Sequence, residues 1–241
     1  MEAEPQPAEG EAVPCPRLHG IRDMRMGTSV FRAPAPGEVL LRIGAVGLCG
    51  SDVHYFTHWD KMDGGLATLS ERGQIIGHEF SGTVAALGEG VAEAWPELTV
   101  GTRVAVEPNI NCKHCESCEI GNPNMCDDLK FAGCGGPDGT CQPWLCYPAK
   151  RDFLFTLPDN LSLADGAMLE PMGIALHALN LGHVRLGDTV AVVGTGPIGL
   201  LVISRTLPSA LITGSFRQLL SRSPPPPIPA HCAAVHSQWP S

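Results

Sequence analysis

The chain has 241 residues, of which 44% are hydrophobic and 17% charged, a composition typical of one large or two modest globular domains. Its formal net charge of -9 argues against a nucleic-acid-binding surface, which would need clustered lysine and arginine, so we expect no nucleic-acid partner. The longest apolar stretch, residues 189–203, is interrupted by glycine and proline, and we expect no membrane span and no membrane partner.

The N-terminal residues 1–16 are acidic and rich in proline, and we expect them to be a disordered lead without a secretory signal. The ten cysteines do not predict disulfides, because the proteins that depend on disulfides are mostly small secreted domains. Free thiols or metal ligands in a cytoplasmic protein are therefore the expected use of these cysteines.

Short apolar segments separated by glycine and proline predict an irregular β-barrel between residues 17 and 160. The strands are expected at residues 39–46, 81–87, 103–106 and 153–157. Ser162 and Asp165 then form an approximate capping box for helical segments that we expect to break near Pro171.

Residues 189–193 predict a buried strand, and residues 197–206 predict the helix that follows it. Between them, Gly194, Gly196 and Gly199 form the G-x-G-x-x-G pattern of a dinucleotide-binding turn. The first glycine allows a tight turn, the second a close approach of the pyrophosphate, and the third close packing of helix on strand. The alternative is a glycine turn that binds no nucleotide.

The sequence pattern changes after residue 206. All 25 Asp and Glu residues lie in the first 188 positions, and the prolines at 224–227 and 229 exclude helix and central strand. We therefore expect residues 208–241 to be an aberrant, disordered, proline-rich tail. The expected cause is truncation, by aberrant splicing, read-through or a frameshift near residues 200–208, with loss of most of a six-stranded cofactor sheet.

Four cysteines follow a C-x2-C-x2-C-x7-C spacing: Cys112, Cys115, Cys118 and Cys126. Two-residue gaps let backbone turns bring thiolates to one centre, and four thiolates fill the tetrahedral coordination of a structural zinc ion. We expect this zinc to hold a loop, with a chance group of thiols as the alternative. His114 lies inside the lobe and is expected to face solvent, although it could replace one cysteine.

A second, scattered set of metal-ligand residues consists of Cys49, His78, Glu79 and Glu170. Cys49 lies in a glycine-flanked turn after an expected strand, whereas His78 and Glu79 lie at a turn before one. A catalytic zinc needs about three protein ligands and one exchangeable position, and its ligands can be far apart in sequence. Spacing alone does not distinguish this set from unrelated core and surface residues.

These motifs, in their order along the chain, resemble those of the zinc-dependent medium-chain dehydrogenases, with the greatest likeness to sorbitol (polyol or xylitol) dehydrogenases. The residues that carry the resemblance are 47–55 (GLCGSDVHY), 77–79 (GHE), the four-cysteine lobe, 170–171 (EP) and 194–199 (GTGPIG). The resemblance covers residues 37–203. It implies a mixed α/β fold, in which a GroES-like irregular β-barrel catalytic domain (17–160) precedes linker helices and the first βα unit of an incomplete Rossmann domain (161–207).

The resemblance also implies an activity, which is oxidation of a secondary alcohol of a small polyol to a ketose with hydride transfer to NAD, and we expect the loss of most of the cofactor domain to impair this activity in this chain. The resemblance further implies one catalytic zinc ion, one structural zinc ion and assembly as a homotetramer. Because no acidic residue follows the glycine turn at the usual spacing of about 20 residues, the choice between NAD and NADP stays open. The alternatives are a non-catalytic zinc-binding isoform that associates with a full-length subunit, and an unstable product without function.

Individual roles follow from the same resemblance. The catalytic zinc ligands would be Cys49, His78 and Glu79, completed by Glu170 directly or through a water molecule. The residues in contact with NAD would be Gly194, Gly196, Pro197, Ile198 and Gly199.

Further roles concern the turn and helix expected after Cys49. Ser51 would be a proton-relay residue, Tyr55 would line the substrate pocket, and Phe131 is a weaker candidate for the same pocket. Asp52 is expected to orient the turn. His54 is either a relay residue or an exposed side chain, because histidine titrates near neutral pH but is also common on protein surfaces.

Overall fold

The computed structural model describes residues 5–58, 72–134, 137–186, 188, 190–206, 211–214 and 234–236. It divides into two compact units, Met1–Met168 and Leu169–Ser241. The boundary lies after Met168, whereas the sequence placed it at residue 160. The reason is that helix α4 (Leu163–Ala167) packs against three strands of the first unit and belongs to it.

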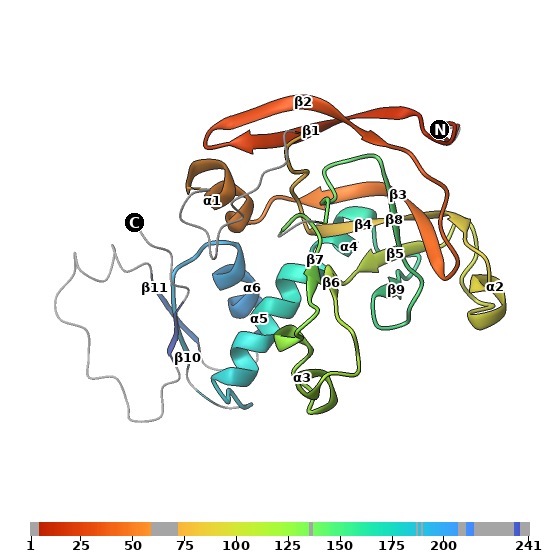
Figure 1. Ribbon diagram of the computed structural model, residues 1–241. Helices are drawn as coiled ribbons and strands as arrows, with labels where there is room; N and C mark the ends of the chain where they lie inside the picture. Colours follow the sequence, from red (N-terminus) through yellow and green to blue (C-terminus); the bar gives the residue numbers. More distant parts are fainter. Residues whose placement is uncertain are drawn as a thin grey trace. The chain divides into compact units, whose positions relative to one another are not determined.

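The first unit is built on a five-stranded antiparallel sheet in the order β8-β3-β4-β5-β9 (Figure 1). Its strands are β3 (Glu38–Gly47), β4 (Glu79–Leu87), β5 (Arg103–Val106), β8 (Trp144–Pro148) and β9 (Leu154–Thr156). All four strands expected from the sequence are present. Among the described residues the sheet is open at β8 and β9, so the expected barrel is an open GroES-like sheet rather than a closed cylinder.

Alternating apolar residues explain how this sheet buries its core. Val39 and Leu41 of β3 pack with Phe80 and Val84 of β4 and with Val104 of β5, and each of these side chains is at most 1% exposed. Successive side chains of a strand point to opposite faces, so this alternation places one face of the sheet in the hydrophobic core.

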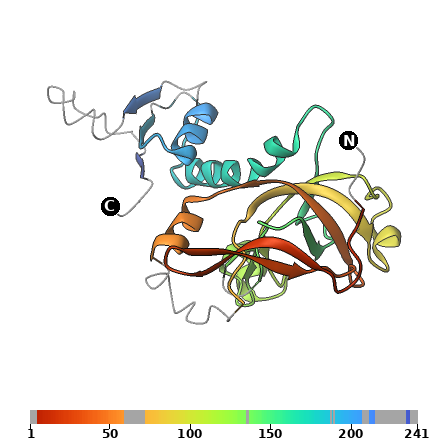
Figure 2. The ribbon, with the colours of Figure 1, turned by 90° about the horizontal axis from the view of Figure 1, so that it is seen from above.

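The opposite face of β3 is covered by the hairpin of β1 (Ala12–Gly20) and β2 (Asp23–Val30), whose strands run side by side in Figure 2. The buried cluster between hairpin and sheet consists of Val13, Phe31 and Leu40. The expectation that residues 1–16 form a disordered lead is therefore wrong from residue 12 onward. Burial of apolar side chains stabilises this strand despite its two prolines.

The remaining elements of the first unit are short and connect the strands. They are α1 (Gly50–His58), α2 (Val91–Ala94), β6 (Asn109–Ile110), α3 (Glu116–Glu119), the 3-10 helix η2 (Pro123–Met125) and β7 (Lys130–Phe131). Helix α4 begins with a complete capping box, because the Ser162 hydroxyl accepts from the Asp165 backbone N–H and the Asp165 carboxylate accepts from the Ser162 backbone N–H.

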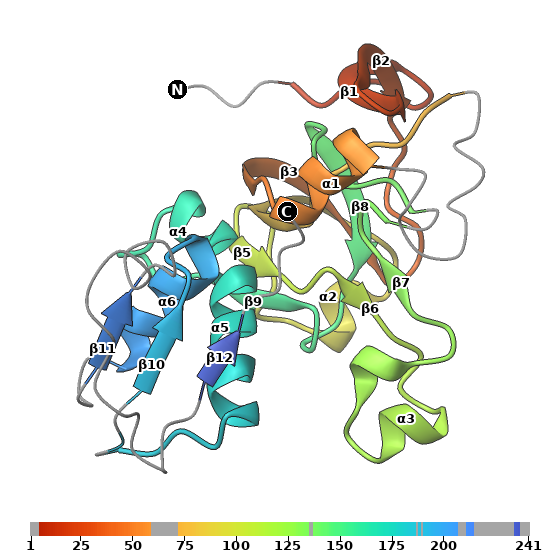
Figure 3. The same cartoon turned by 90° about the vertical axis from the view of Figure 1, so that its left-hand side faces the viewer.

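The second unit contains α5 (Leu169–Leu181), β10 (Val190–Val193) and α6 (Pro197–Thr206) (Figure 3). These three elements share one hydrophobic cluster. The helical segments expected after residue 161 break at Met168 and not near Pro171. Pro171 lies in the first turn of α5, where the backbone N–H that proline lacks would have no partner within the helix.

Two short strands in the tail correct the expectation that residues 208–241 are disordered throughout. β11 (Leu211–Gly214) and β12 (Ala234–His236) pair in parallel with the two edges of β10. An isolated strand leaves backbone donors and acceptors unpaired, and pairing on both edges satisfies them. The proline-rich segment between these strands lies outside the described residues. None of the helices in the described part of the chain is both long and apolar enough to cross a membrane.

Candidate active site and metal centres

One candidate metal centre is formed by Cys49, His78 and Glu79, whose donor atoms lie within 4.8 Å of one another. His78 is buried, at 6% exposure, and the other two are half-buried. The fold therefore brings Cys49 next to the adjacent residues His78 and Glu79, although about 30 positions of sequence separate Cys49 from them. Sulfur, imidazole nitrogen and carboxylate oxygen are all donors that zinc accepts in proteins.

The pairing of β3 with β4 explains why these residues meet. Gly47 at the end of β3 is the direct partner of Glu79 at the start of β4, so the turn that carries Cys49 emerges beside the turn that carries His78. A Cβ atom at position 47 would overlap the carboxylate of Glu79. The absence of a side chain at Gly47 thus leaves the space in which the carboxylate faces Cys49.

Asp52 connects the two turns. Its carboxylate accepts hydrogen bonds from the backbone N–H of Cys49 (2.9 Å) and of Gly77 (3.1 Å), and one oxygen lies 3.9 Å from Nδ1 of His78. The residue is only 3% exposed. Asp52 therefore orients the ligand-bearing turns, in agreement with its expected structural role.

The electrostatics of the three ligands favour a bound cation. Burial raises the pKa of the Cys49 thiol, and hydrogen bonds with Ser51 oppose this rise. Burial likewise raises the pKa of the Glu79 carboxyl, opposed chiefly by His78. Burial therefore disfavours the Cys49 thiolate and the Glu79 carboxylate when no positive charge is near them. A divalent ion between the two groups would offset this desolvation penalty. The donor set and its surroundings therefore fit zinc.

Ser51 and Phe131 lie beside this centre, whereas Tyr55 contacts Cys134. Ser51 is half-buried on α1 and hydrogen-bonds with Cys49. The ring of Phe131 lies 4.9 Å from the ring of His78, centroid to centroid. Tyr55 is 7% exposed, and its hydroxyl lies 2.6 Å from Sγ of Cys134. The roles of these residues toward a substrate remain predictions.

Glu170 lies in the first turn of α5, in the second unit. It is not part of the three-residue donor group found among the described residues. Its function as a further ligand, directly or through water, remains a prediction.

A supporting segment around Gly139 was missed by the sequence analysis. The backbone N–H groups of Gly139, Thr140 and Cys141 donate to carbonyls of residues 75–77, the turn that precedes His78. A Cβ atom at Gly139 would overlap the Ile76 backbone. The glycine spacing in this segment was the available signal, but it does not indicate which turn the segment approaches.

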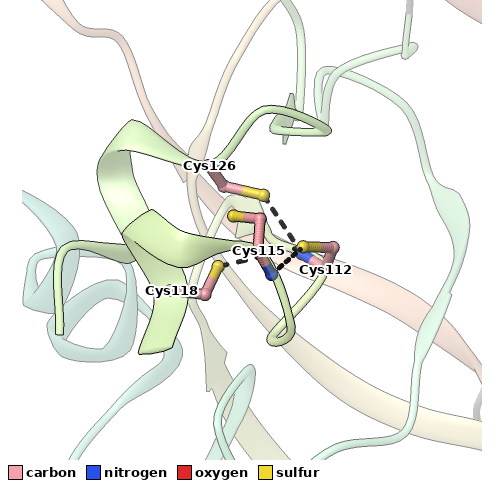
Figure 4. A group of neighbouring side chains, drawn as sticks. All are labelled: Cys112, Cys115, Cys118 and Cys126. Carbon is pink, nitrogen blue, oxygen red and sulfur yellow. Dashed lines mark hydrogen bonds between the residues drawn. The ribbon is translucent and has the colours of Figure 1, made fainter. Parts of the chain in front are cut away.

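The second metal centre comprises Cys112, Cys115, Cys118 and Cys126, whose Sγ atoms converge in Figure 4 and lie within 4.8 Å of one another. Short elements α3 and η2 make the turns that carry them. Backbone N–H groups of Cys112 and Cys115 donate to neighbouring sulfurs at 3.3 Å each. His114 is exposed, as expected, and its Nδ1 lies 2.8 Å from the backbone oxygen of Cys112.

The thiols of this lobe differ strongly in acidity. Backbone hydrogen bonds from Asp127 and Cys118 lower the pKa of Cys115 to about 6. Desolvation and the neighbouring Cys115 raise the pKa of Cys118 to about 12. Four sulfurs at this separation repel one another as thiolates, and a zinc ion at their centre would stabilise all four. The lobe therefore fits a structural zinc with no open coordination position.

The glycine turn of the second unit has the local geometry of a dinucleotide-binding turn. Gly194 has φ of 99°, which favours glycine, and a Cβ atom at Gly199 would overlap the carbonyl of Gly194. The Cβ position of Gly196 faces open space, so a ligand can approach the backbone there. Pro197 begins α6, and Ile198 packs in the hydrophobic cluster of this unit. These features fit the three glycine roles expected from the sequence.

Comparison with known proteins identifies the family. Residues 35–159 match the family model "Alcohol dehydrogenase GroES-like domain". The chain is 40% identical over 174 residues to the D-xylulose reductase of Saccharomyces cerevisiae (72% of this chain, 46% of that protein). It is 35% identical over 188 residues to the sorbitol dehydrogenase of Bacillus subtilis (78% and 50%).

A similar solved structure is the galactitol-1-phosphate dehydrogenase of Escherichia coli, with a TM-score of 0.70 and 28% identity over 88% of this chain and 58% of that one. The chain spans about half the length of the curated relatives it matches. Because the GroES-like match covers more than half of the chain, the protein belongs to the medium-chain dehydrogenase family that carries the alcohol dehydrogenase GroES-like domain.

Proposed function

We propose that this protein is a zinc-dependent oxidoreductase that oxidises a secondary alcohol of a small polyol to a ketose, with NAD as the hydride acceptor. The observation that carries the proposal is the convergence of Cys49, His78 and Glu79 within 4.8 Å. Sulfur, nitrogen and oxygen ligands in a three-residue set leave a coordination position for a substrate oxygen. The names of the relatives, a sorbitol dehydrogenase and a D-xylulose reductase, support a polyol substrate.

The three ligands and their neighbours would have different roles in the proposed reaction. A Zn²⁺ ion bound by Cys49, His78 and Glu79 would polarise the alcohol oxygen and lower its pKa. We assign Ser51 to a proton relay beside the alcohol, in which its hydroxyl would accept the alcohol proton while passing its own proton on toward water; its hydrogen bond with Cys49 places it next to the centre. Tyr55 is assigned to the wall of the substrate pocket, and Glu170 to the centre as a further ligand, either directly or through the water molecule that the substrate oxygen would displace.

The glycine turn is assigned to NAD. The N–H groups in the first turn of a helix have no partner within the helix, and together with the helix dipole they attract a pyrophosphate. Gly196, Pro197 and Ile198 would contact this group, while Gly194 and Gly199 keep the turn compact. Hydride transfer requires the nicotinamide ring and the alcohol carbon at near-contact distance, and holding them there is the remaining task of the protein.

We further propose that the protein acts in the cytoplasm, as a homo-oligomer and, from the family resemblance, as a tetramer. The absence of disulfide-forming patterns in the sequence supports a reducing compartment. Light scattering coupled to size-exclusion chromatography measures the oligomer directly, and fluorescence microscopy of a tagged chain measures the location.

The experiment that tests the proposed function combines metal content with turnover. Elemental analysis of the monodisperse chain should give two zinc ions per chain, and NADH formation should be measured with sorbitol and with xylitol. Cys49→Ser should lose one zinc ion and all turnover, whereas Cys146→Ser, outside both centres, should lose neither. A wild-type chain that binds only one zinc, or whose turnover survives Cys49→Ser, would refute the proposed centre.

A further inference from the structure

A further group of metal-binding residues lies at the edge of the four-cysteine lobe. A ring nitrogen of His114, a carboxylate oxygen of Asp128 and the Sγ of Cys112 lie within 4.8 Å of one another. Cys112 thus belongs to two donor groups, the four-cysteine lobe and this outer one. Its two partners in the outer group are exposed, so ions in solution can reach them.

Two contacts hold His114 beside Cys112. The backbone N–H of His114 donates to the Cys112 sulfur at 3.5 Å, and its Nδ1 lies 2.8 Å from the Cys112 backbone oxygen. A carbonyl oxygen can only accept, so neutral His114 carries its proton on Nδ1 and its lone pair on Nε2. Histidines that bind a metal through one nitrogen typically donate the other N–H to such an acceptor. Ligation through Nε2 is therefore compatible with both contacts.

Asp128 is the movable member of the outer group. It makes no hydrogen bond or ion pair with another residue in the described part of the chain. Zinc bonds of about 2.0–2.3 Å require donor atoms that lie within roughly 4 Å of one another. Rotation about the side-chain bonds of Asp128 can supply much of this small closure while His114 stays in place.

A cavity of about 440 Å³ adjoins the outer group, and its lining includes Cys112, Asp128 and Asn111. Asn111 is only 7% exposed, and its buried Oδ1 has no hydrogen-bond partner among the described residues. A buried acceptor without a donor is unfavourable, and a water molecule bound to a metal ion would supply the missing donor. The cavity therefore offers both space and a polar partner to an ion that keeps some of its water.

The charges around this cavity favour a cation. Four thiolates around one Zn²⁺ leave a net negative charge in the lobe. Asp127 and Asp128 add two carboxylates to the lining, against the ammonium group of Lys130. A divalent ion in the outer group would reduce this excess of negative charge. Sulfur and imidazole donors select ions such as Zn²⁺ or Co²⁺ over Mg²⁺ and Ca²⁺, which prefer oxygen ligands.

We propose that Cys112, His114 and Asp128 form an outer zinc site, in which the Cys112 sulfur bridges the outer ion and the ion of the four-cysteine lobe. A thiolate sulfur has more than one lone pair and can bind both ions, and water completes the outer coordination. Because the outer site has three protein donors, one of them shared, it binds zinc more weakly than the lobe does. The isolated chain therefore retains the two zinc ions of the centres described above. The proposal rests on a zinc-filled lobe, and its test uses no turnover.

Isothermal calorimetry tests the proposal, with Zn²⁺ added to the tag-free chain that already carries two zinc ions by elemental analysis. The wild type should bind one further ion. His114→Asn and Asp128→Asn should each weaken this binding by about tenfold or more, because each replaces a ligand by an uncharged amide.

The matched controls are His177→Asn on α5 and Glu119→Gln on α3, both at exposed positions outside the donor groups found among the described residues. All four variants should keep the two original zinc ions and the circular dichroism spectrum of the wild type. Equal weakening in the control variants would indicate adventitious binding to surface charge and would overturn the proposal.

A second measurement identifies the sulfur ligand. Co²⁺ added to the same two-zinc chain should at once produce the near-ultraviolet absorption of a thiolate–cobalt bond, and this band should be absent from His114→Asn. A wild type that binds no further ion, equal affinity in His114→Asn and wild type, Co²⁺ binding without the thiolate band, or a lobe without zinc at the start would each overturn the proposal. Weaker binding in His114→Asn and Asp128→Asn alone, together with the thiolate band, would establish the site.

Discussion

Gly47 and Glu79 face each other across strands β3 and β4, and the missing side chain of Gly47 is what leaves room for the Glu79 carboxylate. Neither residue could be given this relationship from the sequence, because it depends on the register of the two strands. The missing side chain of Gly47 on β3 thus determines how much space the proposed metal ligand Glu79 has on β4.

Gly47→Ala should therefore damage the first metal centre while the four-cysteine lobe remains intact. The added methyl group overlaps the carboxylate, so Glu79 must rotate away from Cys49 and His78. We expect metal affinity at this centre to fall by about tenfold or more, by analogy with the loss of groups that orient ligands. Competition with a zinc chelator measures this affinity for each centre separately. Gly20→Ala is the control, because a Cβ atom there meets no other atom within 4 Å; equal zinc affinity in both variants would disprove the steric argument.

Asp52→Asn should destabilise the first unit. The Asp52 carboxylate accepts from two backbone N–H groups, and the amide that replaces it presents a donor where an acceptor is needed. At 3% exposure the mismatch cannot be relieved by water, so we expect a loss of about 1–3 kcal/mol in the free energy of unfolding. Urea denaturation measures the loss. Asp159→Asn, at a fully exposed position, should leave the stability almost unchanged, and a similar effect from both variants would count against a specific role of Asp52.

The structure brings together both ligand sets that were proposed from the sequence, but only the four-cysteine set rests on short, local spacings. The four cysteines lie within 15 positions and are joined by turns, so their convergence needs no knowledge of the sheet. Cys49, His78 and Glu79 were identified through a family resemblance, and their donor atoms lie within 4.8 Å of one another, while their role as zinc ligands stays a prediction. The contributions of Gly47 and Gly139 could not be predicted, since each acts by contact with a distant backbone or side chain.

The errors of prediction have a common physical cause. Pro14 and Pro16 suggested disorder, but proline is tolerated where the strand needs no donor, and the neighbouring Val13 and Cys15 are buried. The tail strands β11 and β12 have only four and three residues, too few for a periodic pattern, and they form by pairing with β10. In both regions tertiary contacts decide the structure and local propensity does not.

Cys118→Ser should remove the structural zinc without removing the other. Three sulfurs and a hydroxyl hold zinc far less well than four thiolates, so about one zinc ion per chain should be lost. Limited proteolysis should then cut the lobe at residues 112–126 faster than in the wild type, because the loop has no other centre to organise it. Cys146→Ser serves as the control, since this thiol lies outside the lobe and donates to the backbone oxygen of Arg32, a bond that serine can also form. Unchanged zinc content in Cys118→Ser would mean that the lobe does not bind zinc.

The ion pair between Arg32 and Glu38 should make stability depend on pH. Hydrogen bonds from the Arg32 guanidinium, at 2.5 and 3.0 Å, hold the pKa of the Glu38 carboxyl below its ordinary value, and the Ala35 N–H adds to this effect. A carboxyl with a lowered pKa in the folded state stabilises the protein above its unfolded pKa of about 4.3 and loses that contribution as the pH falls through the folded pKa.

Glu38→Gln should therefore reduce the free energy of unfolding at pH 7 by less than about 1 kcal/mol, since Arg32 is half exposed and solvent screens the pair. The difference from wild type should narrow as the pH is lowered below about 4, because the wild-type carboxyl is then protonated and resembles glutamine. Urea denaturation at pH 7 and at several acidic values measures this convergence. A difference that stayed constant across the pH range would show that Glu38 contributes through packing or neutral hydrogen bonds rather than through its charge.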